Sequence, residues 1–401
     1  MRNRRRRKAE IVFVVVLFVT IGMTLPTYAA DSLKIGVLVP ISGPPAEGGT
    51  RMLKSIKIAT EEINEAGGVL GKKVELEVWD DEAQVDKGVT GAKKLLLKDK
   101  VWALIGGYRS GVTLAQQEVA AEQKRIYMVT DSASNEITDR VKQDYNKYKY
   151  TFRSVMNVDQ VGELMLPVLT EVVRAKTYFY VAETTVWSRD LAELLRKAAE
   201  SRGIKRVGYV ECDPAAQEFT SELAKIKEAN PDVVLCALSG SNDVPFVKQY
   251  IGLKVSKPLC FHAADIIFKT DLGEHGNYLI CMAYSWKLPL TPKTLPFYEK
   301  FTKVHGEPDG WQDMRSYDGM HILIDGIKRA GSLDVEKVIK SLEATDYMGA
   351  AGRYVFDDKH QCKWGPGYLE GIIFQRIQGK DMIIYPPKVA TGKLAPAPWW
   401  R

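Results

Sequence analysis

Residues 33–81 contain two strand patterns separated by a helix pattern: LKIGVLVP (33–40), SIKIATEEINEAG (55–67) and KVELEVWDD (73–81). The outer segments are rich in β-branched residues. In the middle segment Ile56, Ala59 and Ile63 recur at helical spacing before two glycines end the pattern. A strand, a helix and a strand of these lengths predict a βαβ unit, in which the two strands lie parallel in one sheet.

The same alternation continues for about two hundred residues. Further strands are expected at 101–107, 125–130, 177–183, 206–211, 232–238 and 258–263. The helices expected beside them are 86–99, 113–123, 159–173, 190–202, 216–229 and 243–252. Such a pattern predicts an α/β fold with two parallel-dominated sheets, each flanked by helices.

The C-terminal part has a different pattern. Three helices are expected close together at 294–305, 315–330 and 334–344, followed by an antiparallel hairpin within 367–387 that turns at Gly379. This part is too short for a third core, and the 401 residues suit two domains. We therefore expect it to complete both domains, which are then interleaved, joined by several crossings and able to hinge.

The N-terminus carries most of the net charge. Six of the first ten residues are basic and one is acidic, whereas the whole chain has a formal net charge of +6. An almost continuous apolar stretch (11–25) follows, and Thr27 and Ala29 occupy the −3 and −1 positions of a cleavage site. This pattern is typical of a secretory signal peptide. We expect residues 1–29 to be removed and the mature protein to be periplasmic or extracellular.

A membrane anchor is the alternative for this segment, but its apolar stretch is shorter than the ~20 residues that a spanning helix needs. Once the segment is removed, the mature chain is nearly neutral, which argues against nucleic-acid binding. The five cysteines are an odd number, so at least one thiol is expected to be free.

Motifs for catalysis or metal binding are absent from the sequence. It contains no CxxC pair, no HExxH spacing, no GxSxG elbow and no phosphate-binding glycine motif. We expect no metal, no cofactor and no enzymatic activity.

Two predicted strands end in polar loops that lead into helices. The first loop is Tyr108–Thr113 and the second is Asp131–Asn135. Ligands collect at the carboxyl ends of parallel strands, and free backbone N–H groups at a helix start favour a carboxylate. Plain helix capping by the hydroxyls is the alternative for each loop. Arg109 either pairs with a ligand carboxylate or points to solvent.

The segments LKIGVLVPISGP (33–44), EEINEAGGVLGKKVELEVWDDEAQVDKG (61–88), VWALIGGYRSGVT (101–113) and IYMVTDSAS (126–134) are similar to the leucine/isoleucine/valine-type periplasmic binding proteins. These are the type I solute-binding subunits of ABC importers, and the resemblance runs from about residue 33 to residue 385. It implies two lobes joined by three hinge crossings, with a ligand in the cleft between them. Lobe 1 would comprise 30–151 and 284–365, and lobe 2 would comprise 152–283 and 366–401.

The resemblance also implies site residues on the first lobe. Ser110 and Thr113 fall on the loop that holds the ligand carboxylate in this family. Ser132, Ala133 and Ser134 fall on the second loop, which contacts both the carboxylate and the ammonium group. Either Ala133 or Ser134 matches the family's threonine position.

The second lobe supplies further implied site residues. Trp187 falls where the family often has a tyrosine that closes over the ligand. The acidic residue that pairs with the ammonium group matches Ala264 or, with a shift of one residue, Asp265. Tyr108, Tyr284 and Trp286 could form an apolar wall. If Asp265 does not face the cleft, the ligand is not an α-amino acid.

The resemblance thus implies a monomeric binding protein that delivers a branched-chain-type amino acid or related small carboxylate to the membrane permease of an ABC importer. A secreted ligand-sensing receptor with the same cleft is one alternative. A binder of a non-amino aromatic or aliphatic acid or amide is another. A secreted hydrolase is a third, and it would convert its ligand.

Overall fold

The computed structural model describes residues 32–263, 266, 270–284, 289–306 and 312–400. The predicted signal peptide lies outside the described residues, and so do Ala264, Asp265 and Trp286. Within this part of the chain, no helix is long and apolar enough to cross a membrane.

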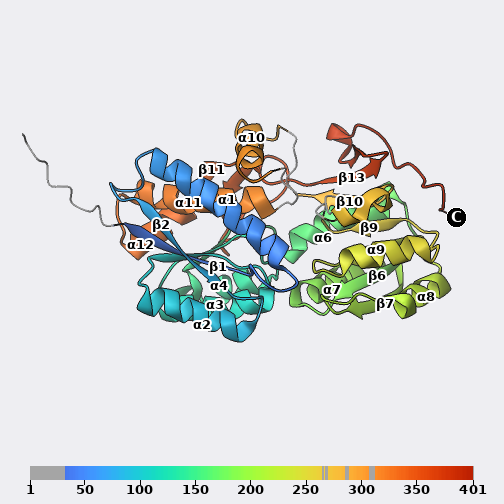
Figure 1. Cartoon of the computed structure of the whole chain (residues 1–401), viewed down its shortest axis with the longest axis horizontal. Helices are drawn as coiled ribbons and strands as arrows, with labels where there is room; N and C mark the ends of the chain where they lie inside the picture. Colours follow the sequence, from blue (N-terminus) through green and yellow to red (C-terminus); the bar gives the residue numbers. More distant parts are fainter. Residues whose placement is uncertain (1–31, 264–265, 267–269, 285–288, 307–311, 401) are drawn as a thin grey trace, which may run out of the picture.

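A sheet of five parallel strands forms the centre of one lobe, here called lobe 1 (Figure 1). Its order is β2-β1-β3-β4-β5. The strands are β1 (Leu33–Val39), β2 (Val74–Asp80), β3 (Ala103–Gly106), β4 (Tyr127–Val129) and β5 (Thr151–Arg153). Every residue of β3 is buried, and all but one of β1, as expected for parallel strands that helices cover on both faces.

Lobe 1 takes its helices from both halves of the chain. They are α1 (Ala46–Glu65), α2 (Val85–Lys93), α3 (Ser110–Glu122), α4 (Glu136–Gln143), α5 (Tyr145–Tyr148), α10 (Thr294–His305), α11 (Gln312–Ala330) and α12 (Val335–Glu343). A π-helical turn (Lys94–Lys98) extends α2, and a two-stranded ribbon joins β11 (Asp346–Met348) to β12 (Arg353–Val355). One core contains Ile35 of β1, Ile56 of α1 and Ile324 of α11, so the C-terminal helices do complete the first domain.

A seven-stranded sheet forms the centre of lobe 2, in the order β14-β13-β10-β9-β8-β6-β7. Its strands are β6 (Thr177–Glu183), β7 (Lys205–Cys212), β8 (Val233–Ala237), β9 (Leu259–Phe261), β10 (Ile280–Ala283), β13 (Ile372–Ile377) and β14 (Lys380–Tyr385). The first five are parallel, and the C-terminal hairpin β13–β14 adds an antiparallel edge, as the sequence predicts.

Among the described residues, four α-helices cover the second sheet: α6 (Val158–Pro167), α7 (Val186–Glu200), α8 (Thr220–Ala229) and α9 (Asp243–Gly252). Short helical turns follow at Val168–Val172, Thr270–Gly276 and Pro387–Val389. All five cysteines are buried free thiols, four in this lobe and Cys362 in lobe 1.

The order of the elements gives three crossings between the lobes: after β5, after β10 and after β12. This is the type I two-lobed architecture that the sequence indicates. The residue boundaries of the two lobes, at 151/152, 283/284 and 365/366, stay a prediction.

The β11–β12 ribbon and helix α5 were not predicted, and two further features of lobe 1 differ from the sequence prediction. Helix α1 begins at Ala46, nine residues before the predicted helix. Its first turn was not predicted because Gly48 and Gly49 have a low helix propensity. A Cβ atom at Gly49 would lie 1.8 Å from the carbonyl oxygen of Pro40, so this close approach requires glycine. Strand β5 was not predicted, because its charged Arg153 does not resemble a buried strand residue.

Candidate functional site

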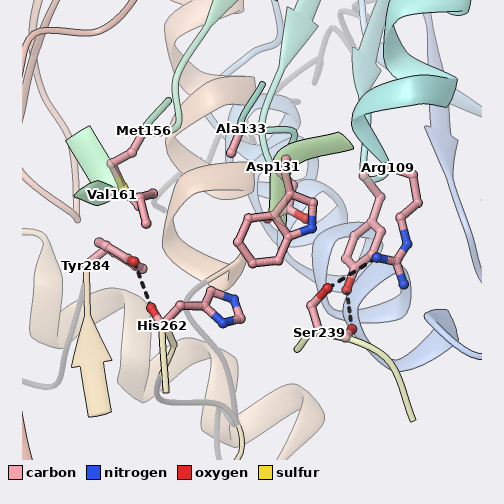
Figure 2. Close-up of a pocket in the computed structure, with 10 residues that line it drawn as sticks. Arg109, Asp131, Ala133, Met156, Val161, Ser239, His262 and Tyr284 are labelled. Atoms are coloured by element: carbon pink, nitrogen blue, oxygen red, sulfur yellow. Dashed lines mark hydrogen bonds between the residues drawn. The ribbon is translucent and has the colours of Figure 1, made fainter. Parts of the chain in front are cut away.

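A pocket lies between the two lobes, where the carboxyl ends of their strands meet (Figure 2). It encloses about 530 Å³ of space, including its open mouth. Figure 2 shows Met156, Val161 and Tyr284 on one side and Arg109 and Ser239 on the other. The lining residues are Tyr108, Arg109, Asp131, Ala133, Met156, Val161, Trp187, Ser239, His262 and Tyr284.

Five of the ten residues predicted for the site line this pocket: Tyr108, Arg109, Ala133, Trp187 and Tyr284. They come from four separate segments of the chain, so the fold brings them together. Asp265 lies outside the described residues.

The two glycines before Tyr108 direct the first loop toward the pocket. Gly106 and Gly107 have φ values of 125° and 83°, a region that favours glycine. A Cβ atom at Gly106 would lie 2.3 Å from the carbonyl oxygen of Leu38. The chain therefore turns sharply at the end of β3, and α3 begins at Ser110.

The four predicted hydroxyl residues, Ser110, Thr113, Ser132 and Ser134, lie beside the pocket and are buried. They bind the two loops to each other: the Thr113 and Ser132 hydroxyls share a hydrogen bond, and the backbone N–H of Ser134 donates to Ser110 Oγ at 3.2 Å. None of the four is among the residues that line the pocket. Their contact with a ligand stays a prediction.

Buried Arg153 holds the second loop in place. Its guanidinium donates to the backbone carbonyls of Ser132 and Ser134, at 3.2 and 2.6 Å, and to Gln361 Oε1. Burial lowers the pKa of Arg153 to about 10. This residue therefore links the site loop to the segment where the chain returns from lobe 1 to lobe 2.

Arg109 does not point to bulk solvent. Its Nη1 donates to Glu183 Oε2 at 2.7 Å and to Ser239 Oγ at 3.2 Å, and its side chain is 10% exposed. Burial alone would lower the pKa of Arg109. The charge of Glu183 and its hydrogen bond, together with Tyr108 and Asp131, outweigh this effect, and the pKa is raised. Of the two alternatives for Arg109, solvent exposure is therefore wrong.

Aromatic rings form much of the pocket wall. The Trp187 side chain is 8% exposed, and its ring lies 4.6 Å from the His262 ring between centroids. The Tyr284 hydroxyl donates to the carbonyl oxygen of His262 at 2.7 Å. With Met156 and Val161, these rings make a mostly apolar pocket with few polar groups, which is typical of a small-molecule site.

Asp131 was named in the sequence only as part of the second polar loop. Five further residues in or beside the pocket were not predicted: Met156, Val161, Glu183, Ser239 and His262. Glu183 ends β6, His262 directly follows β9 and Ser239 lies two residues after β8, so their place at a carboxyl strand end was a usable signal. Met156 and Val161 resemble ordinary core residues in the sequence.

Arg315 of α11 lies behind the wall, fully buried, 5.2 Å from the centroid of the Tyr284 ring. Burial lowers its pKa, while Asp131 is among the groups that favour its charged form. Asp131 also favours the charged form of Arg109. The Asp131 carboxylate is therefore near two buried arginines.

Within the described ranges, no three His, Cys, Asp or Glu side chains lie close enough together to hold a metal ion. The side chains that line the pocket offer charge, hydrogen bonds and aromatic contact.

Comparison with known proteins gives one consistent family. Residues 32–369 match the model of a family described as periplasmic binding protein. The chain is 25% identical over 346 residues to Leu/Ile/Val-binding protein homolog 1 of Brucella melitensis, an alignment that covers 85% of this chain and 90% of that protein.

Solved structures share the fold. The branched-chain amino acid transporter substrate binding protein LivJ from Streptococcus pneumoniae, in complex with isoleucine, has a TM-score of 0.78 at 20% identity, covering 89% of this chain and all of that one. A solute binding protein from R. palustris, in complex with benzoate, has a TM-score of 0.79 at 20% identity, covering 91% and 97%.

Proposed function

Because the chain belongs to the periplasmic binding protein family, we propose that it is the extracytoplasmic substrate-binding subunit of an ABC importer. The observation that carries this proposal is the pocket, which takes its lining from both lobes. A ligand that contacts both lobes stabilises their closed arrangement, because in the open arrangement it loses its contacts with one of them. The protein then delivers its ligand to a membrane permease, as an exported monomer.

The proposed ligand is a branched-chain-type amino acid or a related small carboxylate. Arg109 supports a ligand that carries an anionic group. Its Nη1 donates to Glu183 and Ser239, and within the described residues no acceptor is bonded to its Nε or Nη2. These two nitrogens can therefore donate to a ligand carboxylate. The N–H groups at the start of α3 and the loop at Ser132–Ser134 would add to this contact. Among the described residues, Asp131 is the carboxylate in the pocket wall, and we infer that it pairs with the ammonium group of an amino-acid ligand.

A non-amino aromatic acid is the second candidate. The rings of Tyr108, Trp187, His262 and Tyr284 favour it, since a flat ring stacks well on such walls. The R. palustris neighbour that binds benzoate has the same fold.

A thermal-shift panel on the mature chain tests this function. The protein is unfolded and refolded first, to remove any bound solute, and is then tested with leucine, isoleucine, valine, benzoate and benzamide. A ligand at about 100 times its dissociation constant adds about 2.7 kcal/mol of stability. We expect at least one of the acids to raise the melting temperature, and mass spectrometry should recover that acid unchanged.

Two results would argue against the proposal. A panel without any shift would leave the pocket with no carboxylate ligand of these classes. A converted ligand would identify an enzyme, as the hydrolase alternative requires.

A further inference from the structure

Side chains of the protein itself bridge the two lobes at the pocket. The Tyr108 hydroxyl donates to the carbonyl oxygen of Ser239 at 3.2 Å, and the Ser134 hydroxyl donates to Asp190 Oδ2 at 3.0 Å. Arg109 donates to both Glu183 and Ser239. In each bond the donor belongs to a loop of lobe 1 and the acceptor to lobe 2.

Among these contacts, Arg109–Glu183 is an ion pair, and both of its side chains are deeply buried. The Glu183 side chain has no exposed surface. Within its own lobe it accepts hydrogen bonds from the N–H of Ser239 at 2.7 Å and from the Ser239 hydroxyl at 3.0 Å. In the described part of the chain, Arg109 is the one cation that forms an ion pair with Glu183.

We propose that Arg109 and Glu183 form a latch, an ion pair across the cleft that stabilises the closed arrangement of the lobes before a ligand binds. The inference rests on the proposed function only in that it assumes lobes that open and close. Glu183 keeps its two Ser239 hydrogen bonds when the lobes separate, but it loses its counter-charge, which lobe 1 supplies.

The burial of the pair determines what each substitution does. Removing one partner leaves an uncompensated charge in the closed interior, which is strongly unfavourable, whereas removing both is often tolerated. In the open arrangement water can solvate either charge. A single substitution therefore shifts the equilibrium toward the open arrangement, and a double substitution restores part of the closed population.

The test measures the distance between the lobes in the ligand-free mature chain. Cysteines introduced at exposed Lys57 of α1 and Lys225 of α8 carry a fluorophore pair. The five native thiols are buried and should not compete for the label. We expect one dominant short distance in the parent protein. In Glu183→Gln, which preserves shape, and in Arg109→Met, we expect the population at longer distance to rise at least fivefold.

Glu211→Gln is the matched control. It removes an exposed ion pair with Arg189, 2.7 Å long, that lies within lobe 2, so the distance should not change. The double variant Arg109→Met/Glu183→Gln should lie nearer to the parent than either single variant does. The melting temperature and circular dichroism of each variant verify folding.

The latch is wrong if the ligand-free parent protein is mainly open, or if Glu183→Gln gives the same distances as the parent. Should Arg109→Met fail to fold, Glu183→Gln alone decides. These distance measurements use no ligand. A thermal-shift panel in which no compound raises the melting temperature would therefore overturn the proposed function without changing the measured distances.

Discussion

Trp187 is the residue whose surroundings a ligand should change most. Its ring lies against His262 in the pocket and is almost fully enclosed. We expect isoleucine or benzoate, whichever the thermal panel selects, to change the tryptophan fluorescence. Trp187→Ala should remove most of that change, because the other indoles among the described residues lie outside the pocket lining.

Trp102→Phe is the control for this experiment. The Trp102 ring donates to the carbonyl oxygen of Leu333 at 3.0 Å, within lobe 1 and away from the pocket, so its loss should leave the change intact. A full signal in Trp187→Ala would refute the assignment of Trp187 to the ligand wall.

Arg109 should distinguish acids from their neutral analogues. If its guanidinium binds a ligand carboxylate, Arg109→Ala should weaken acid binding by at least ~1.5 kcal/mol, the contribution of a charged hydrogen bond. Isothermal titration with benzoate and benzamide measures this, because the amide has the same ring but no charge. An equal loss for both compounds would assign Arg109 to lobe closure alone.

The polar loops of the site could be predicted because they directly follow strands in the sequence. The partner of Arg109 could not, since Glu183 is 74 positions away and belongs to another lobe. The hydroxyl residues show the same limit. Ser110 and Ser134 were identified as polar loop residues, but only the packing shows that they bond to each other.

Most elements could be predicted because parallel strands are short apolar runs and their helices have apolar residues at regular spacing. The N-terminal turn of α1 and strand β5 were not predicted for a common reason. Tertiary contacts determine both: the close approach of Gly49 to Pro40 and the buried hydrogen bonds of Arg153.

The close approach at the start of α1 predicts how a substitution there changes stability. Gly49→Ala places a methyl group 1.8 Å from a backbone oxygen, so the helix must move away from β1. We expect a loss of about 1–3 kcal/mol in the free energy of unfolding, measured by urea denaturation, as for other overpacked sites.

Gly252→Ala is the matched control, because it changes the last residue of α9, where no heavy atom lies within 4 Å of the added carbon. Alanine is the better helix former, so this variant should be as stable as the parent or slightly more stable. Equal stability of the two variants would contradict the close-approach explanation for Gly49.

For the whole molecule, the two-lobed architecture could be predicted from the order of the elements. A C-terminal part without a core of its own had to complete the domains before it, and its helices and hairpin do so in lobe 1 and lobe 2. The relative position of the lobes could not be predicted, because it depends on contacts such as Arg109–Glu183 between segments far apart in the sequence.

The net charge of the whole chain comes mostly from its first ten residues. If they direct export, the mature chain should begin at Ala30, and mass spectrometry of its N-terminal peptide should find that residue. Ala29→Lys should block processing, because signal cleavage needs a small residue at this position. Ala30→Ser, just beyond the bond, should be processed normally. A full-length chain retained in the membrane fraction of the parent strain would instead support the anchor alternative, and would place the binding lobes on a tether beside the permease.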